Sequence, residues 1–162
     1  MTLFYKEMKS PVGKLKFVAS SKALVAVLWE QEPPNRVKLD KMNLDPQHSV
    51  LIEAERQISE YFAGERIRFD LPLQLDGTEF QKKVWQALRE IPFGKTKSYQ
   101  DLARAVGSPE ASRAVGAASG KNPLSIVVPC HRVVAANGAL TGFAGGLETK
   151  AALLALEEKN SG

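Results

Sequence analysis

The spacing of apolar residues changes once along this chain of 162 residues, near residue 75, and that change limits the folds it can adopt. Before it, turn-forming residues separate three short predicted strands (residues 4–9, 15–19 and 24–29). Leu15, Phe17 and Ala19 lie at every second position of the middle segment, which is the period of a half-buried strand. After residue 75 the spacing is that of helices. The pattern predicts an α+β protein with two small domains, residues 1–75 and 76–162.

Each predicted domain contains a helix with clear boundary signals. In the first, Ser49 is the expected N-cap of a helix that carries apolar residues on one face and stops at Gly64. The preceding residues 31–46 are rich in turn formers and are expected to form a loop. In the second, Thr78 can cap a helix that runs to about Ile91.

Two further short helices are predicted over residues 97–107 and 111–120, with a tight Gly-Ser-Pro turn between them. This arrangement describes a helix-turn-helix. The second helix contains mostly Ala, Gly, Ser and Val, and Arg113 is its only long side chain. A helix that distinguishes base sequences needs several long polar side chains. We therefore expect close contact with a duplex and little sequence preference, although small residues also suit close helix packing.

Cysteine, histidine and charge exclude several classes of protein. One cysteine, Cys130, and two histidines, His48 and His131, allow no internal disulfide and no zinc site at the usual spacing, so we expect no metal.

The sequence has no apolar run near the ~18 residues of a membrane span and no secretion signal, which predicts a protein of the cell interior. Residues 76–162 hold 11 basic against 8 acidic side chains. This excess favours a polyanion-binding surface, but a solvated charged face gives the same pattern.

The reactive groups are concentrated in residues 126–134, Ile-Val-Val-Pro-Cys-His-Arg-Val-Val. The β-branched residues predict a buried strand that delivers Cys130 to a turn. A thiolate is the nucleophilic form of cysteine, and an adjacent base or positive charge raises its population. His131 and Arg132 are expected to supply both influences. An isolated cysteine is commonly a small buried hydrophobe, but the adjacent histidine favours a nucleophile.

The segment Pro129-Cys130-His131-Arg132-Val133 resembles the active-site signature of the O6-alkylguanine-DNA alkyltransferases. Further segments agree in order and spacing: Ile91-Pro92-Phe93-Gly94 before Ser98-Tyr99, Arg113-Ala114-Val115-Gly116, Asn122-Pro123, and Gly142-Phe143-Ala144-Gly145-Gly146-Leu147. The resemblance is strong over roughly residues 78–158 and rests on the order of elements before that. It implies a ribonuclease H-like sheet-and-helix domain, then a mainly helical, winged-helix-like domain that contains the helix-turn-helix.

The resemblance also implies roles for individual residues. Cys130 would accept the alkyl group, His131 would act as its base through a water, and Glu157 would orient the imidazole. Asn122 would brace the turn that carries Cys130, and Tyr99 would hydrogen-bond the extruded base and help rotate its phosphate. The sequence permits the role of Glu157 independently, because this residue borders the apolar stripe of the predicted last helix.

On the DNA side, Arg113 would fill the gap that the flipped base leaves, and backbone groups of Cys130, Val133 and Ala144 would hold the guanine. The positions expected to contact DNA are Ser98, Ser112, Arg113, Ala114 and Gly116. Ala144 departs from relatives that have serine, so a serine hydroxyl contact would be missing. The zinc ligands that some members carry in the first domain are also absent from the sequence.

The activity implied by the resemblance is repair of O6-alkylguanine, with O4-alkylthymine left open as a second substrate. The partner would be double-stranded DNA, bound through its minor groove. A thioether is not reversed by water or cellular thiols, so each molecule would act once, without a cofactor. We expect a monomer with access to DNA in the nucleoid or nucleus.

Three other functions are consistent with parts of this sequence. A lesion-binding protein without alkyl transfer would lack the cysteine, so Cys130 argues against it. An ordinary winged-helix transcription regulator is disfavoured by the short side chains of the second helix and by the Cys130-His131 pair. In a cysteine hydrolase the nucleophile and its base are usually distant in sequence, whereas here they are adjacent.

Overall fold

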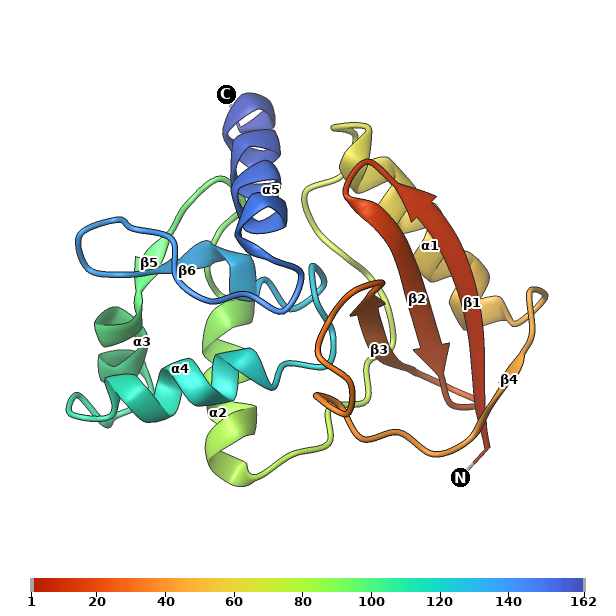
Figure 1. Ribbon diagram of the computed structural model, residues 1–162, viewed down its shortest axis with the longest axis horizontal. Helices are drawn as coiled ribbons and strands as arrows, with labels where there is room; N and C mark the ends of the chain where they lie inside the picture. Colours follow the sequence, from red (N-terminus) through yellow and green to blue (C-terminus); the bar gives the residue numbers. More distant parts are fainter. Residues whose placement is uncertain (1, 162) are drawn as a thin grey trace.

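The computed structural model describes residues 2–161, and its N-terminal part is a four-stranded sheet covered by one helix (Figure 1). The strands are β1 (Leu3–Ser10), β2 (Gly13–Ala19), β3 (Leu24–Trp29) and β4 (Met42–Leu44), in the order β3-β2-β1-β4. The first three pair antiparallel and confirm the predicted strands, while β4 pairs parallel with β1. β4 was not predicted, because its three residues lie inside the expected loop and carry no periodic signal.

The helix α1 (Ser49–Phe62) packs on this sheet and starts one residue earlier than expected. Its N-cap is His48, whose Nδ1 accepts a hydrogen bond from the Val50 N–H at 3.2 Å. Ser49 is already helical, so the prediction that it caps the helix is wrong. The stop at Gly64 is confirmed: this glycine has a φ of +78°, the left-handed conformation that ends many helices.

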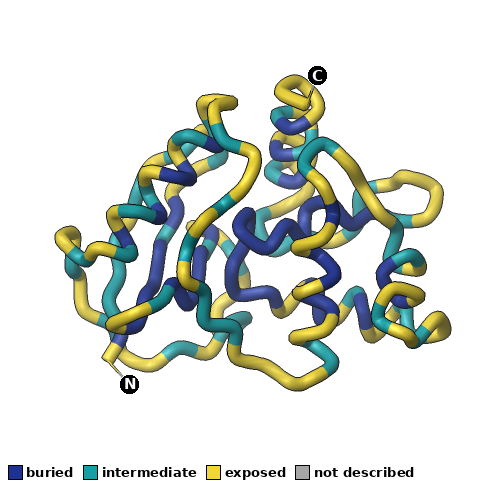
Figure 2. The backbone as a smooth tube through the Cα atoms, turned by 180° about the vertical axis from the view of Figure 1, so that it is seen from behind, coloured by how far each residue is buried: buried dark blue, intermediate teal, exposed yellow. Residues whose placement is uncertain are grey.

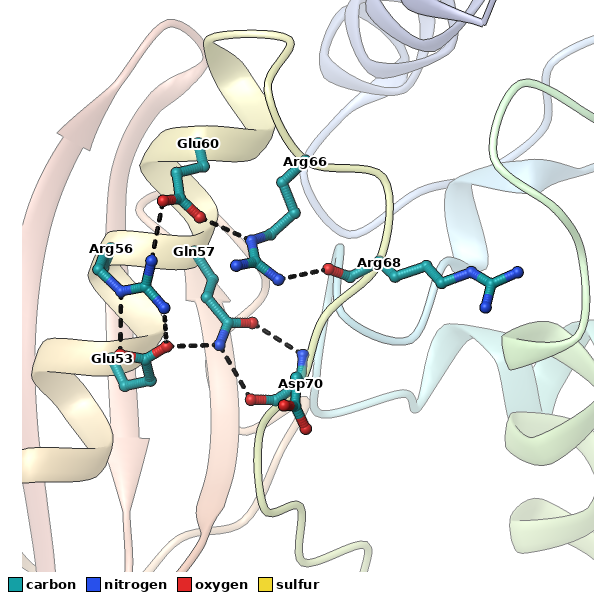
Figure 3. A network of polar contacts seen from close by, with 7 residues as sticks. All are labelled: Glu53, Arg56, Gln57, Glu60, Arg66, Arg68 and Asp70. Carbon is teal, nitrogen blue, oxygen red and sulfur yellow. Dashed lines mark hydrogen bonds and ion pairs between the residues drawn. The ribbon is translucent and has the colours of Figure 1, made fainter.

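A polar network attaches the segment after α1 to the helix itself (Figure 3). The Gln57 side chain, which is buried, accepts from the Asp70 N–H at 2.8 Å and donates to the Asp70 carbonyl at 2.9 Å. Arg66 donates to Glu60 at 2.7 Å. The chain then runs beside β3, where Leu24 exchanges backbone hydrogen bonds with residues 72 and 74. These contacts cover the free edge of β3 before the helical part begins.

The C-terminal part is mainly helical. Its elements are α2 (Glu79–Arg89), β5 (Lys97–Ser98), α3 (Tyr99–Ala105), α4 (Ser112–Gly120), β6 (Val133–Val134) and α5 (Leu147–Asn160). Thr78 caps α2 in a complete capping box with Gln81, as its position predicted. Helices α3 and α4 occupy the two segments predicted for them. Within residues 2–161, no helix combines the length and apolarity that a bilayer crossing requires.

The strand predicted to precede the cysteine is not formed. Residues 125–128 make a tight turn, in which the Val127 N–H donates to the Ser125 carbonyl at 2.9 Å. Ile126 is buried with a φ of +72°, a left-handed conformation that a strand cannot contain. The β-branched residues of this segment are buried in a turn and are not paired in a strand.

One cluster of buried side chains extends from the sheet into the helices, from Phe17 and Ile58 to Trp85 and Leu153. Figure 2 shows buried backbone concentrated in the sheet and in the segment between it and the helices. That segment contains Leu124 and the turn before the cysteine. The Val27 N–H of β3 donates to the Pro123 carbonyl at 2.9 Å. The edge strand β3 thereby contacts the segment that leads into this turn.

Candidate active site

Cys130 is the first residue of η1 (Cys130–Arg132), a single 3₁₀ turn. Its N–H donates to the Val128 carbonyl at 2.8 Å. The side chain of Asn122, which is fully buried, closes the preceding turn: Nδ2 donates to the Val128 carbonyl at 2.8 Å and Oδ1 accepts from the Leu124 N–H at 2.9 Å. The structure therefore brings Asn122 to the turn that it was predicted to brace.

Cys130 lines a pocket of about 240 Å³. The other lining residues come from both parts of the chain: Pro33, Arg36, Tyr99, Gly116, Ser119, Gly120, Ser125, Gly142, Phe143 and Ala144. Tyr99, Gly116 and Ala144 are predicted site residues. Val133 is buried and does not line this pocket, and its N–H already donates to the Cys130 carbonyl. A backbone contact between Val133 and a bound base would have to use its carbonyl group.

Behind the cysteine, the Glu157 carboxylate is buried and accepts hydrogen bonds from four residues. His131 Nε2 lies 2.6 Å from Oε2, and Arg132 donates to both oxygens at 2.8 and 3.0 Å. The Tyr61 hydroxyl donates at 2.6 Å and the Gly94 N–H at 3.3 Å. Burial alone raises the pKa of Glu157, but the bonds from His131 and Arg132 outweigh it and hold this pKa at about 2. Glu157 is therefore ionised at neutral pH.

His131 is fully buried, and burial lowers its pKa in spite of the carboxylate beside it. The imidazole is therefore neutral at pH 7. Because an ionised carboxylate only accepts hydrogen bonds, Nε2 carries the proton and Nδ1 is the free base. Among residues 2–161 no group bonds to Nδ1. The predicted pairing of His131 with Glu157 is present, while their catalytic roles stay predictions.

Arg132 follows Cys130 closely in the sequence, but its guanidinium contacts Glu157 instead of the thiol. Its guanidinium pairs with Glu157 and donates to the Ile91 carbonyl at 2.7 Å. Its charge is thus balanced within the network and is not directed at the thiol. The expectation that Arg132 promotes the thiolate is wrong, because a buried guanidinium requires a carboxylate partner and Glu157 supplies it.

Burial favours the protonated form of the Cys130 thiol. Burial raises its pKa, and the effects that oppose burial include a hydrogen bond with Asn122 and the positive charges of Arg36 and Lys150. Neither cation was predicted. Arg36 lies in the loop after β3, where it pairs with Glu32 at 2.9 Å. Lys150 lies on α5 and is buried.

The hydroxyl of Tyr99, which lines the pocket, is hydrogen-bonded to the Thr141 hydroxyl at 2.8 Å. The predicted contact of Tyr99 with an extruded base would therefore replace this bond. Gly116, on α4, lies opposite the ring: a Cβ placed there would be 3.7 Å from two carbons of Tyr99. The absence of a side chain at Gly116 keeps this side of the pocket open.

Of the remaining predicted DNA contacts, Ser98 is the N-cap of α3, and Ser112, Arg113 and Ala114 begin α4. The Ser98 hydroxyl accepts from the Asp101 N–H at 3.0 Å, which caps α3, so it is already engaged. Ser112 begins α4 and is half-buried. Arg113 and Ala114 are exposed, and within the described chain the Arg113 side chain forms no ion pair or hydrogen bond. Ser112, Arg113 and Ala114 are consecutive residues at the N-terminal end of α4.

Three site residues were missed by the reasoning from sequence, and two had a detectable signal. Tyr61 lies on the apolar face of α1, where a hydroxyl needs a partner. Lys150 precedes Leu153 and Glu157 by three and seven residues, so all three share the buried stripe of α5. A charged side chain on such a stripe requires a function or a partner. Arg36, in a polar loop, had no such signal.

Two sequence models of protein families match the chain. Residues 79–159 match the family described as "6-O-methylguanine DNA methyltransferase, DNA binding domain", and residues 3–75 match its "ribonuclease-like domain". These matches and the structure confirm the expected α+β fold class.

Individual proteins are similar over nearly the whole chain. The methylated-DNA–protein-cysteine methyltransferase of Methanosarcina acetivorans is 43% identical over 96% of this chain and 98% of its own. The constitutive enzyme of that name from Bacillus subtilis is 47% identical over 95% and 94%. A crystal structure of OGT from Mycobacterium tuberculosis in complex with DNA superposes with a TM-score of 0.89, at 40% identity over 99% and 94%.

Proposed function

The chain belongs to the family of methylated-DNA–protein-cysteine methyltransferases, and from this premise we propose that it repairs O6-alkylguanine in DNA by irreversible transfer of the alkyl group to Cys130. The observation that carries the proposal is the position of the only cysteine of the sequence, in a pocket and directly in front of a buried His-Glu-Arg network. Such a network can hold one base in one tautomer while the thiol reacts.

The proton on the sulfur has a defined route in this proposal. His131 Nε2–H is held by Glu157, which leaves Nδ1 as a buried acceptor without a protein partner within residues 2–161. Buried polar atoms are usually satisfied by protein or by ordered water. A water between Sγ and Nδ1 would satisfy this atom and carry the proton from the thiol to the imidazole. The imidazolium formed would be stabilised by the ionised Glu157.

The alkyl transfer then makes one bond and breaks one. The sulfur attacks the saturated carbon in line, the S–C bond forms, and the C–O6 bond breaks. Guanine leaves as the neutral base once it takes a proton, which the imidazolium can return through the same water. The product is a thioether, so the protein would act once per molecule and would need no cofactor.

The attack in line requires that the alkylated nucleotide leaves the base stack. We assign this step to α4, whose exposed end carries Arg113, with the small residue Ala114 beside it. Arg113 would enter the duplex from the minor groove as the helix-turn-helix α3–α4 contacts the backbone. The flipped base would enter the Cys130 pocket, where Tyr99 would exchange Thr141 for a contact to it. Supplying duplex DNA that contains O4-alkylthymine tests whether the same pocket also accepts this base.

The proposal is tested by incubating the protein with duplex DNA that contains one O6-[methyl-³H]methylguanine. We expect one methyl group per molecule, recovered on the peptide that contains Cys130, and none on a Cys130→Ala variant with an unchanged melting temperature. The transferred amount should stay at one per protein at excess DNA. Label on another residue, transfer by the alanine variant, or repeated turnover would each overturn it. Size exclusion with and without DNA tests the expectation of a monomer, and fluorescence imaging of a tagged chain tests its place inside the cell.

A further inference from the structure

Tyr61 is a buried tyrosine whose hydroxyl the proposed transfer reaction does not use. It lies near the end of α1, in the first part of the chain, whereas Glu157 lies on α5 in the second part (Figure 1). The Tyr61 hydroxyl is 2.6 Å from Glu157 Oε2, and both side chains are buried. His131 Nε2 is 2.6 Å from the same oxygen. One carboxylate oxygen therefore binds both the candidate base and a hydroxyl from the other part of the chain.

The hydrogen-bond donors around Glu157 outnumber the acceptor sites of its carboxylate. A carboxylate offers about four lone-pair sites, two on each oxygen. Oε2 receives bonds from Tyr61, from His131 and, at 3.0 Å, from Arg132. Oε1 receives bonds from Arg132 at 2.8 Å and from the Gly94 N–H at 3.3 Å. Because three donors share the negative charge of Oε2, the bond from Tyr61 weakens the attraction between that oxygen and His131.

The Tyr61 side chain is held in place by three aromatic rings. Its ring centre lies 5.3 Å from that of Phe62, 5.6 Å from that of Phe69 and 6.1 Å from that of Phe93. Burial and the negative Glu157 raise the pKa of Tyr61, so its hydroxyl stays protonated. An ionised carboxylate only accepts hydrogen bonds, so the hydroxyl is the donor. The bond to Oε2 therefore persists while the imidazole gains and loses a proton.

The acidity of the protonated His131 depends on its contact with Oε2. Burial lowers the pKa of His131 most; of the charged groups that act on the ring, Glu157 raises this pKa, and Arg132 and Lys150 lower it. Within residues 2–161, the only hydrogen bond of the imidazole is the one to Oε2. A second donor on that oxygen makes the imidazolium less stable and therefore a stronger acid. Tyr61 is such a donor.

We infer that Tyr61 is a positioning residue of the transfer reaction, which holds Glu157 Oε2 and keeps the His131 imidazolium acidic enough to return its proton to the leaving guanine. The inference rests on the proposed function in taking His131 as the base. His131 Nδ1 gains the proton of the sulfur, and guanine receives it when the S–C bond forms and the C–O6 bond breaks. Too strong a base would keep the proton, so the Tyr61 hydroxyl favours the return step.

The first test measures the titration of His131 without DNA, by ¹³C NMR of the imidazole carbons in the wild type, Tyr61→Phe and Tyr5→Phe. His48, the other histidine of the sequence, is the internal reference. Tyr61→Phe should raise the midpoint of His131 by about one pH unit, because more of the charge of Oε2 then acts on the imidazole. Tyr5→Phe removes a hydroxyl that has no hydrogen-bond partner among the described residues, so it should match the wild type.

The second test compares two alkylations of Cys130 in the same variants. Transfer from O6-methylguanine in duplex DNA needs a proton on the leaving base, whereas iodoacetamide releases iodide, which needs none. Tyr61→Phe should slow methyl transfer about threefold or more, because the imidazolium is then a weaker acid. Alkylation by iodoacetamide should not slow. A general loss of structure around the cysteine would instead slow both reactions.

A His131 midpoint that stays or falls in Tyr61→Phe would overturn the inference, as would unchanged methyl transfer or an equal slowing of both alkylations. Should Tyr61→Phe fail to fold, 3-fluorotyrosine is incorporated at residue 61 alone, in a Tyr5→Phe, Tyr99→Phe background that removes the other two tyrosines. Its hydroxyl is a stronger donor, so the midpoint should fall relative to ordinary tyrosine in that background, and no movement contradicts the inference. Failure of the wild type to accept methyl from DNA would count against the proposed function, while the titration still tests Tyr61.

Discussion

Removing the Tyr61 hydroxyl should destabilise the protein, because this hydroxyl of the N-terminal helix α1 donates a hydrogen bond to Glu157 in the candidate active site. Burial and the negative Glu157 raise the pKa of Tyr61, so its hydroxyl stays protonated and donates to Oε2 at 2.6 Å. A hydrogen bond to a charged group contributes about 1.5–3 kcal/mol. Tyr61→Phe keeps the ring contacts with Phe62, Phe69 and Phe93, so it opens no cavity. Glu157 also keeps its other donors.

We therefore expect Tyr61→Phe to lower the free energy of unfolding by about 2 kcal/mol. For a chain of this size that corresponds to a melting temperature lower by roughly 4–8 °C. Urea unfolding followed by tryptophan fluorescence gives the free energy, and calorimetry gives the temperature. Tyr5→Phe is the control, because the half-exposed Tyr5 hydroxyl has no hydrogen-bond partner among the described residues. Equal stability of the two variants would show that the bond to Glu157 contributes nothing.

Two other predictions concern charge. The pKa of Glu157 lies at about 2 in the fold against an ordinary 4.5, so its contribution to stability is complete above pH 4.5 and is lost as pH falls towards 2. The free energy of unfolding should fall less over that interval in Glu157→Gln than in the wild type, and parallel curves would contradict this. Arg113→Ala should slow methyl transfer from duplex DNA about tenfold or more, because the inserted side chain offsets an unstacking cost of a few kcal/mol. Alkylation of Cys130 by iodoacetamide should be unchanged in Arg113→Ala, and Arg68→Ala, an exposed arginine of the first part, should transfer normally.

Local signals in the sequence were sufficient for most of the fold. Turn-forming residues delimited β1 to β3, alternation indicated β2, and Thr78 located the start of α2, because these signals act over a few neighbouring residues. They failed at Ile126, where β-branched residues are buried in a left-handed turn that no short pattern encodes. β4 was missed because a three-residue edge strand is defined by its partner β1 and not by its own residues.

The residues of the candidate site also fall into those that local sequence signals predict and those that only tertiary contacts define. Cys130, His131 and Asn122 lie within a few residues of one another, and their proximity could be expected from the sequence. Glu157 was expected from the family resemblance and from its place on the stripe of α5. Arg132 was misassigned, because adjacency along the chain does not determine which anion a guanidinium meets after folding. Arg36 and Tyr61 reach the site from the other part of the chain, through contacts that only the tertiary structure defines.

The Arg36 guanidinium donates to the Gly120 carbonyl, at the end of α4, and to the Asn122 carbonyl, at 2.9 and 2.8 Å. This limits how modular the protein can be in evolution or in engineering. A chimera that joins the reactive half to an unrelated leading segment inherits a helix whose terminal oxygens have lost their donor. Such a chimera requires a positively charged side chain in the new segment that donates to the same carbonyl groups. Selection therefore acts on the contacts between the two parts of the chain as well as on Cys130.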